Sequence, residues 1–472
     1  MVCMHLVKLI ANYLIFSVVL LLVSLISYSQ ENSPFSRYGL GDIYPQASIA
    51  SRAMGGLTST VTSTQFINTV NPASYGSLGL VTYDFALSID ARTLLSKTPV
   101  EKYSSTNFIP SYLQLGMPLT KAGKRNGAGL VFGLRPATRI NYSVEEGSRI
   151  FYDSLGTSDS LHQLYEGNGG LNQVFLGIGK TWKNKNNPNN SISIGFNAGY
   201  GWGTKFISNK TDFPSDSSYE NWYRSNATDS THYWGMFLNP GIMASFTLKE
   251  TTDPISKLKN SYVLAIGGSG TLEQNLNASR DLTRQTFFYK EDGGIVVVDS
   301  VYEGNTNHGK INVPFNFNGG LMLNKMISNG PFVVKKWGIG VDYNFAPWSK
   351  YRYYGEPDRV NDSWFLRAGI EFSPSPLSNK GVFANGMYRL GYYNGKEYQN
   401  ADGNGYKVQA FTFGYSFNLR KYHSYDKQFT MINTALEFGK RGSSVNNVTE
   451  NFFKISLGLS LSDIWFIKRK YD

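Results

Sequence analysis

The stretch Ile192-Ser-Ile-Gly-Phe-Asn-Ala-Gly-Tyr-Gly-Trp-Gly203 decides the fold of this chain. Apolar side chains occupy every second position, and only Ser, Gly and Asn stand between them. Successive side chains of a β-strand point to opposite faces, so the pattern predicts a strand with one apolar face and one small, polar face. The run is longer than an average strand of about five or six residues. Its length is typical of a tilted strand that crosses a membrane as part of a β-barrel.

The same alternation recurs along the chain. We expect an all-β, transmembrane antiparallel barrel of about fourteen strands, and this even number is typical of bacterial single-chain barrels. The expected strands are 80–91, 107–118, 127–140, 171–182, 191–207, 233–248, 260–273, 310–323, 335–347, 362–373, 381–393, 406–419, 428–440 and 451–463.

The connections between these strands alternate in length and charge. The odd-numbered connections are the longer ones in most pairs and are net acidic, whereas the even-numbered turns are short and net basic. Outer-membrane barrels have long outer loops and short periplasmic turns, so this order predicts that both termini are periplasmic. Solvation of tight turns by Lys and Arg is an alternative explanation for the charge bias.

Tryptophan positions agree with a membrane-spanning wall. Seven of the eight Trp residues lie at or near expected strand ends, where barrels carry aromatic girdles. They are Trp182, Trp202, Trp234, Trp337, Trp348, Trp364 and Trp465.

Composition excludes several classes of protein. Charged residues make up 17% of the chain, below an ordinary soluble domain, while Gly (48 residues) and aromatic residues (15%) are abundant. A single Cys excludes a disulfide scaffold. The net charge of +11 is spread over separate turns, which argues against nucleic-acid binding. We find no catalytic or phosphate-binding motif and no histidine pattern for a metal, so we expect no enzyme activity, no cofactor and no metal.

The N-terminus begins with a targeting segment. A lysine at position 8 precedes an apolar run over 9–26, and small residues follow at Ser27 and Ser29. This pattern predicts a signal peptide over residues 1–29, with a permanent membrane anchor as the alternative. We expect residues 80–472 to form the barrel, and the Gly-rich residues 30–79 to form a separate segment.

Within that segment, the turn around Arg52, Met54, Gly55 and Gly56 and the motif Asn71-Pro72-Ala73 precede the first strand. A periplasmic segment with these motifs before fourteen strands resembles the FadL-type family of outer-membrane transporters for long-chain fatty acids and other hydrophobic compounds. The resemblance implies that residues 30–79 form a hatch inside the barrel. It also implies passive transport of a hydrophobic ligand, with a possible lateral exit beside a kink in the third strand, where Pro136 lies. Pro110, Pro240 and Pro314 also fall in expected strands.

Other side chains are candidates for contacts with a ligand. By alternation, Arg135, Arg367 and Arg389 face the lumen, where a guanidinium could hold a carboxylate or pair with neighbouring acids in structural salt bridges. Aromatic residues in the long connections could form a first capture groove or pack the loops together. They are Phe213, Trp222, Tyr223, Phe287 and Phe288.

Three functions stay open at this point. The first is a channel for hydrophobic small molecules in the outer membrane of a Gram-negative bacterium. The second is a scaffold or shuttle barrel of a protein secretion system, and the third is an outer-membrane enzyme whose Ser, His and acid meet on one surface. The expected partners are outer-membrane lipid and lipopolysaccharide, the hydrophobic ligand, the barrel assembly machinery that reads a C-terminal aromatic signal, and a secretion-system protein under the second function.

Overall fold

The structure is a computed structural model. It describes residues 33–121, 124–152, 157–212, 224–254, 258–290, 294–304, 306–329, 332–377, 382–400, 403, 405–420 and 429–463. The expected signal peptide and the C-terminal residues after Asp463, Trp465 among them, lie outside the described residues. In the part of the chain that is described, no helix is both long and apolar enough to span a membrane.

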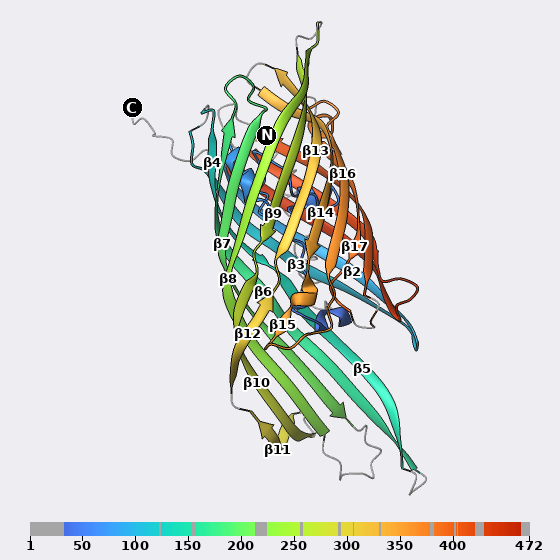
Figure 1. The fold of residues 1–472 in the computed structure, drawn as a ribbon. Coiled ribbons are helices and arrows are strands. Elements are labelled where there is room, and N and C mark those ends of the chain that lie inside the picture. Colours follow the sequence, from blue (N-terminus) through green and yellow to red (C-terminus); the bar gives the residue numbers. More distant parts are fainter. Residues whose placement is uncertain are drawn as a thin grey trace, which may run out of the picture.

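The strands form a closed antiparallel barrel of fourteen wall strands, which confirms the expected fold class (Figure 1). Each wall strand pairs with its neighbours in sequence, and β2 (Val81–Lys97) pairs with β20 (Val448–Asp463) to close the wall. We call the end at Val81 and Asp463 the proximal end and the opposite end the distal end. The uninterrupted wall strands between them are β3 (Val100–Pro118), β6 (Thr157–Lys183), β7 (Ser191–Asp212), β8 (Arg224–Thr252), β14 (Phe332–Ala346), β16 (Ser363–Phe372), β17 (Met387–Lys396), β18 (Lys407–Arg420) and β19 (Phe429–Arg441).

Three wall strands are interrupted. The third is split into β4 (Gly127–Pro136) and β5 (Thr138–Tyr152), and the seventh into β9 (Lys259–Thr271) and β10 (Gln274–Tyr289). The eighth consists of β12 (Asn307–Val313) and β13 (Asn316–Asn329), and β11 (Ile295–Glu303) adds to β10 before it. Pro136 and Pro314 mark two of the breaks, because proline cannot donate a ladder hydrogen bond.

The alternation predicted for β7 is present in the structure. Ile192 is 52% exposed on the outer surface, whereas Asn197 is fully buried inside. Trp202 and Trp234 face each other across β7 and β8 and mark the distal edge of the apolar belt. On the distal side of Trp234, the outward position is taken by Ser230 and other polar residues, so the strands leave the membrane there.

The strands are longer than the sequence pattern predicted. Most described residues of the expected connections 92–106, 141–170, 208–232 and 274–309 belong to strands. Distal to the belt, both faces of a strand meet water or polar contacts, so the apolar alternation that defined the strands disappears. The result is a distal extension of β5, β6, β7, β8, β10 and β11, at the bottom of Figure 1.

Trp348 corrects the predicted girdle. It begins the 3-10 helix η4 (Trp348–Lys350), which precedes the short strand β15 (Arg352–Tyr353), and its ring stacks on Tyr398 at a centroid distance of 4.1 Å. Trp348 is buried in an apolar cluster with Leu40, so it packs inside the barrel. A strand-end position alone does not separate a lumen residue from a girdle residue.

Residues 33–80 run through the interior of the barrel, in blue in Figure 1. The segment contains η2 (Pro34–Arg37), β1 (Asp42–Ile43), α2 (Ile49–Arg52) and η3 (Pro72–Ser77). Phe35 packs against Tyr406 at the distal end, and Gly76 contacts Thr181 at the proximal end. We call this interior segment the hatch. A further short helix, α3 (Val382–Asn385), precedes β17.

Candidate functional site: a wall gap, its covering strip and a lumen cavity

The wall has a gap beside Pro136. The β3–β4 ladder runs from Pro118–Gly129 to Leu113–Leu134 and stops there. From Tyr112 to Val100, β3 pairs with β2 alone among the described residues. Beyond Pro136, β5 pairs with β6 and, at two residues, with β1. The kink therefore separates β3 from β5, and no strand ladder joins their facing edges in the described part of the chain.

A strip of the hatch, Asp42–Ala47, covers this gap from inside, and we call it the covering strip. Its β1 residues pair with Arg139 and Thr138 of β5, as an antiparallel neighbour would. The backbone N–H of Tyr44 donates to the carbonyl of Ala137 at 2.9 Å, and the Gln46 amide donates to the carbonyl of Pro136 at 2.9 Å. These bonds satisfy backbone groups that the kink would leave exposed to an apolar environment.

The covering strip also reaches the other side of the gap. The hydroxyl of Tyr44 is 2.8 Å from Oγ of Ser111 in β3. Tyr44 therefore bridges β5 and β3 at the place where the wall strands do not pair.

Arg52, expected in the first hatch turn, fixes the covering strip. Its guanidinium donates to the carbonyl of Pro45 at 2.7 Å and of Ala47 at 3.2 Å, and to Oγ of Ser88 in β2 at 3.1 Å. It also lies 5.2 Å from the centroid of the Tyr44 ring. The buried Arg52 guanidinium thus fixes the conformation of the covering strip and joins the strip to the wall.

The Met54-Gly55-Gly56 turn docks onto wall glycines. Gly55 and Gly56 have φ angles of +70° and +82°, which L side chains rarely adopt. A Cβ on Gly391 would lie 2.0 Å from the backbone N of Gly55, and one on Gly369 would lie 2.4 Å from Met54. The small inner face read from the sequence is therefore the docking surface of the hatch.

Asn71-Pro72-Ala73 begins η3 at the proximal end. The Asn71 side chain caps the helix by accepting from the N–H of Ala73, and it donates to the carbonyl of Ser59 at 2.5 Å. Pro72 packs on a wall glycine, because a Cβ on Gly195 would lie 2.2 Å from its backbone. The motif locks the proximal part of the hatch to the wall.

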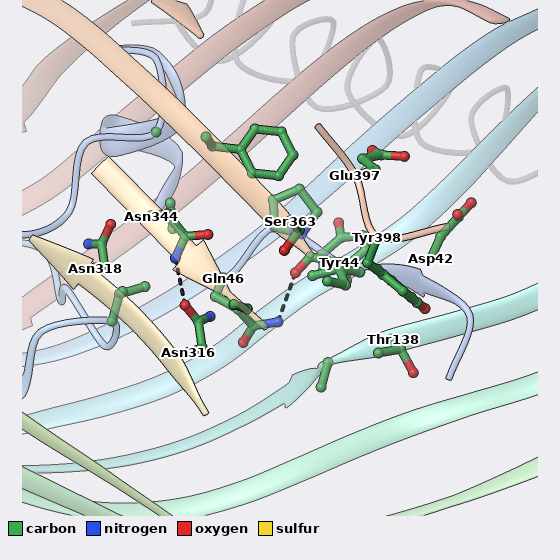
Figure 2. Close-up of a pocket in the computed structure, with 18 of the residues that line it drawn as sticks. Asp42, Tyr44, Gln46, Thr138, Asn316, Asn318, Asn344, Ser363, Glu397 and Tyr398 are labelled. Carbon is green, nitrogen blue, oxygen red and sulfur yellow. Dashed lines mark hydrogen bonds between the residues drawn. The ribbon is translucent and has the colours of Figure 1, made fainter. Parts of the chain in front are cut away.

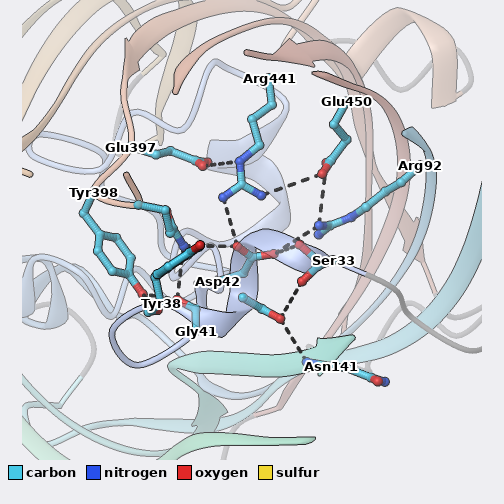
Figure 3. Close-up of polar contacts among 12 residues, drawn as sticks. Ser33, Tyr38, Gly41, Asp42, Arg92, Asn141, Glu397, Tyr398, Arg441 and Glu450 are labelled. Carbon is cyan, nitrogen blue, oxygen red and sulfur yellow. Dashed lines mark hydrogen bonds and ion pairs between the residues drawn. The ribbon is translucent and has the colours of Figure 1, made fainter. Parts of the chain in front are cut away.

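Charged side chains bind the distal part of the hatch (Figure 3). Asp42 pairs with Arg441 of β19 at 3.0 Å and with Arg92 of β2 at 3.3 Å, and it accepts from Ser33 at 2.5 Å. Burial by itself would raise the pKa of Asp42, but the two guanidinium groups outweigh burial and hold the pKa below its ordinary value. Further acids complete this Asp42 cluster: Asp90, Glu397 and Glu450.

A cavity of about 360 Å³ lies between the hatch and the wall (Figure 2). Tyr44, Gln46 and Thr138 line it, so it reaches the covering strip and the gap. Its other walls combine apolar residues with amides and charged groups. Among them are Leu40, Leu171, Val313, Trp348, Phe365, Asn316, Asn344, Arg52, Arg135 and Arg367.

The three lumen arginines are separated by the structure. Arg135 lines the cavity next to Pro136, donates to Thr69 at 3.1 Å, and lies 4.8 Å from the centroid of the Phe175 ring. Arg367 also lines the cavity. Arg389 does not, and its guanidinium pairs with Glu371 at 3.2 Å. Arg389 therefore fits the structural alternative, whereas Arg135 and Arg367 stay candidates for ligand contact.

The predicted capture aromatics fall into two groups. Phe213, Trp222 and Tyr223 lie outside the described residues. Phe287 and Phe288 lie in β10 rather than in a loop, and Phe287 is 1% exposed, so only Phe288 presents its ring to the surroundings.

The enzyme alternative would need a serine, a histidine and an acid on one surface. Ser279 of β10 lies between His232 and His308 of the adjacent strands, but no hydrogen bond joins the serine to either ring. No group of three metal-binding side chains is found among the described residues.

Sequence patterns missed Asp42, Tyr44 and Arg441. Asp42 and Tyr44 lie in a stretch without alternation, and Arg441 lies at the end of a strand that reads as a connection. The turn Gly39-Leu-Gly41 was the one sequence signal for a structured segment before Asp42, because both glycines adopt positive φ angles.

Comparisons with known proteins agree with this architecture. A family model described as BamG matches residues 9–472. The toluene transporter TbuX of Ralstonia pickettii has a TM-score of 0.51 at 14% identity, over 90% of this chain and 99% of its own. The toluene transporter TodX of Pseudomonas putida (TM-score 0.49, 15% identity) and a FadL homologue of Pseudomonas aeruginosa (0.47, 12%) each align over 90% of this chain, and over 99% and 100% of their own chains. The likeness to TbuX shows the fold. No curated protein matches the chain. The FadL-type barrel expected from the sequence is confirmed, and its apolar belt indicates a Gram-negative outer membrane.

Proposed function

The chain belongs to the BamG family. From the lumen cavity and the gap in the wall, we propose that it is an outer-membrane channel for hydrophobic small molecules. In this proposal a ligand enters from the distal end, occupies the lumen cavity and leaves sideways into the bilayer through the gap beside Pro136. Movement is passive, and the covering strip must shift to let the ligand pass.

One observation carries the proposal: the cavity ends at the gap. The residues that cover the gap, Tyr44 and Gln46, and those at the kink, Arg135 and Ala137, all line the cavity. About 360 Å³ is within the range of small-molecule sites. A ligand in the cavity would therefore be separated from the bilayer by a two-residue strand pairing and a few side-chain hydrogen bonds.

The lining indicates an amphipathic ligand, such as a long-chain fatty acid. Leu171, Val313 and Phe365 offer apolar contact, and Arg135 and Arg367 offer guanidinium groups to a carboxylate. The name of TbuX assigns toluene to a barrel of the same fold, which supports a hydrophobic ligand class. We include Phe288 with Phe213, Trp222 and Tyr223 as candidates for distal capture.

A reversible disulfide tests the proposal. Ile43 and Thr138 face each other in the β1–β5 pairing, and the only native cysteine, Cys3, lies in the expected signal peptide. The double variant Ile43→Cys, Thr138→Cys should lock the covering strip when oxidised. Uptake of radiolabelled oleate or toluene by intact cells should then fall to the level of cells without the protein, and a reductant should restore it.

Each single cysteine variant is the matched control, since it changes the same side chains without the lock. Undiminished uptake by the oxidised double variant, with disulfide formation verified by mass spectrometry, would refute the lateral route. Mass spectrometry of molecules that co-purify with the native barrel would identify the ligand class directly.

A scaffold role in a protein assembly is the second candidate. The family name BamG suggests the barrel assembly machinery, and much of the lumen is filled by polar contacts between hatch and wall rather than by open space. In vivo cross-linking separates the candidates. A stable protein partner together with a ligand-free barrel would favour the scaffold, and a secretion-system protein would then be one possible partner.

A further inference from the structure

A second cavity, of about 440 Å³, lies on the distal extension, apart from the gap and the lumen cavity. It is formed by β7, β8, β10 and β11 on the face that continues the lumen surface. The outward-facing residues of β8 at this level, Asn226 and Ser230, are polar, which places the cavity on the distal side of the Trp202–Trp234 pair.

The strand register explains the hollow. Asn209 pairs with Ala227, Ala227 with Arg284, and Arg284 with Tyr302, so these four side chains form one transverse row. Strands lie about 4.8 Å apart, so the row spans roughly 14 Å. The methyl group of Ala227 is the shortest side chain of the row, and it leaves a depression between the Asn209 amide and the Arg284 guanidinium.

An ion pair between β8 and β10 lines the cavity beside this row. Asp229 lies beside Ala227 in β8 and accepts from Arg280 through Nε at 3.0 Å and Nη2 at 2.6 Å. Thr231 also donates to Asp229 at 3.2 Å, and the Arg280 guanidinium lies 5.5 Å from the centroid of the Tyr353 ring. Asp229 and Arg280 are thus held in place before any ligand arrives, which lowers the entropic cost of binding.

Two polar groups of the cavity, the Asn209 amide oxygen and the Arg284 guanidinium, have capacity for a ligand in the described structure. Oδ1 of Asn209 is buried without a hydrogen-bond partner, and Arg284 has no acidic partner among the described residues. The Tyr302 side chain is 49% exposed. A buried amide oxygen accepts from a hydroxyl, a guanidinium binds an anion in a bidentate fashion, and a tyrosine ring packs against an apolar C–H face.

We propose that this cavity binds a saccharide that carries a carboxylate. A sugar ring combines hydroxyl groups for Asn209 and Asp229 with a C–H face for Tyr302, and its carboxylate would meet Arg284. The apolar lining is limited to Ile207, Ala227 and Leu282, which is too little for the hydrophobic ligands of the lumen cavity. The site therefore goes beyond the proposed channel function and does not depend on it.

Binding of a glucuronic-acid-containing oligosaccharide to the full-length detergent-solubilised barrel, measured by calorimetry, tests the site. The neutral glucose counterpart is the second probe. We expect the acidic sugar to bind more tightly, and Arg284→Gln to weaken it by about tenfold or more, the equivalent of one charge-assisted hydrogen bond. Ala227→Leu should fill the depression and abolish binding of both sugars.

Arg149→Gln is the matched control, because it removes an exposed guanidinium from β5 of the same distal extension. Heat-modified electrophoretic mobility verifies that every variant is a folded barrel. Unchanged affinity in Arg284→Gln, equal affinity for the two sugars, or no binding to the folded native barrel would each overturn the proposal.

Discussion

At the scale of single residues, Arg52 fixes the covering strip from outside it, in α2. It is 4% exposed and serves three acceptors, the carbonyls of Pro45 and Ala47 and the hydroxyl of Ser88. Arg52→Met would remove the donor to the carbonyls of Pro45 and Ala47, at a cost of about 1–3 kcal/mol for each one that water does not reach, whereas Ser88 keeps its bonds to Ser111 and Ser456. We expect faster amide exchange at Tyr44, whose N–H donates to Ala137, in a folded barrel, with Arg52→Lys intermediate. Native protection in Arg52→Met would show that the strip is held by other contacts.

Asp42 gives a pH prediction at the same scale. Because Arg441 and Arg92 hold its folded-state pKa below the ordinary value, the stabilisation is present above the ordinary carboxyl pKa of about 4. This stabilisation is lost as the pH falls through the lowered folded-state pKa of Asp42, not between pH 7 and pH 5. Proteolysis of the hatch in the native barrel should therefore increase only below about pH 4.

Asp42→Asn isolates that carboxylate from the other acids of the Asp42 cluster. The variant should be more susceptible to proteolysis at pH 7, because Arg441 and Arg92 lose a charged partner, and its change below pH 4 should be smaller than that of the native protein. The same acid transition in both proteins would assign the effect to other carboxylates.

At the scale of elements, the hatch turn tests the docking surface. Gly391→Ala places a Cβ against the backbone of Gly55, whereas Gly268→Ala meets nothing closer than 3.6 Å. We expect Gly391→Ala to displace the turn and to speed exchange of the Gly55 amide, which donates to Thr412 at 2.8 Å. Gly268→Ala should behave as the native protein. Equal protection in both variants would mean that the turn tolerates the shift.

The elements also show where sequence reasoning succeeds and where it stops. Alternation placed β7 and its outward face correctly, because the lipid forces every second residue to be apolar. The apolar alternation does not predict the distal parts of β5 and β10, because no lipid imposes a pattern on them. Phe287 was accordingly assigned to a loop although it is buried in β10.

At the scale of the whole molecule, the site depends on the register between strands and on the closure of the barrel around the hatch. Neither can be read from the sequence. Arg52 and Pro136 stand out in the sequence, but their convergence on one gap follows from the path of the hatch across the lumen. Tyr44 and Ser111 are 67 positions apart and meet only because β3 and β5 separate. The cavity likewise exists only between closed elements.

The orientation of the barrel is the remaining prediction at this scale. Basic residues concentrate in the proximal turns, for example Lys121, Lys124 and Lys183, and a proximal position at the periplasmic side fits the alternation of short turns and long distal hairpins. We expect a cysteine replacing Ser148 in distal β5 to react with an impermeant maleimide on intact cells. A cysteine replacing Asn186 in the proximal turn should react only after the outer membrane is opened. The reverse labelling pattern would invert the barrel, and it would place the saccharide cavity in the periplasm and require ligands of the lumen cavity to enter from inside the cell.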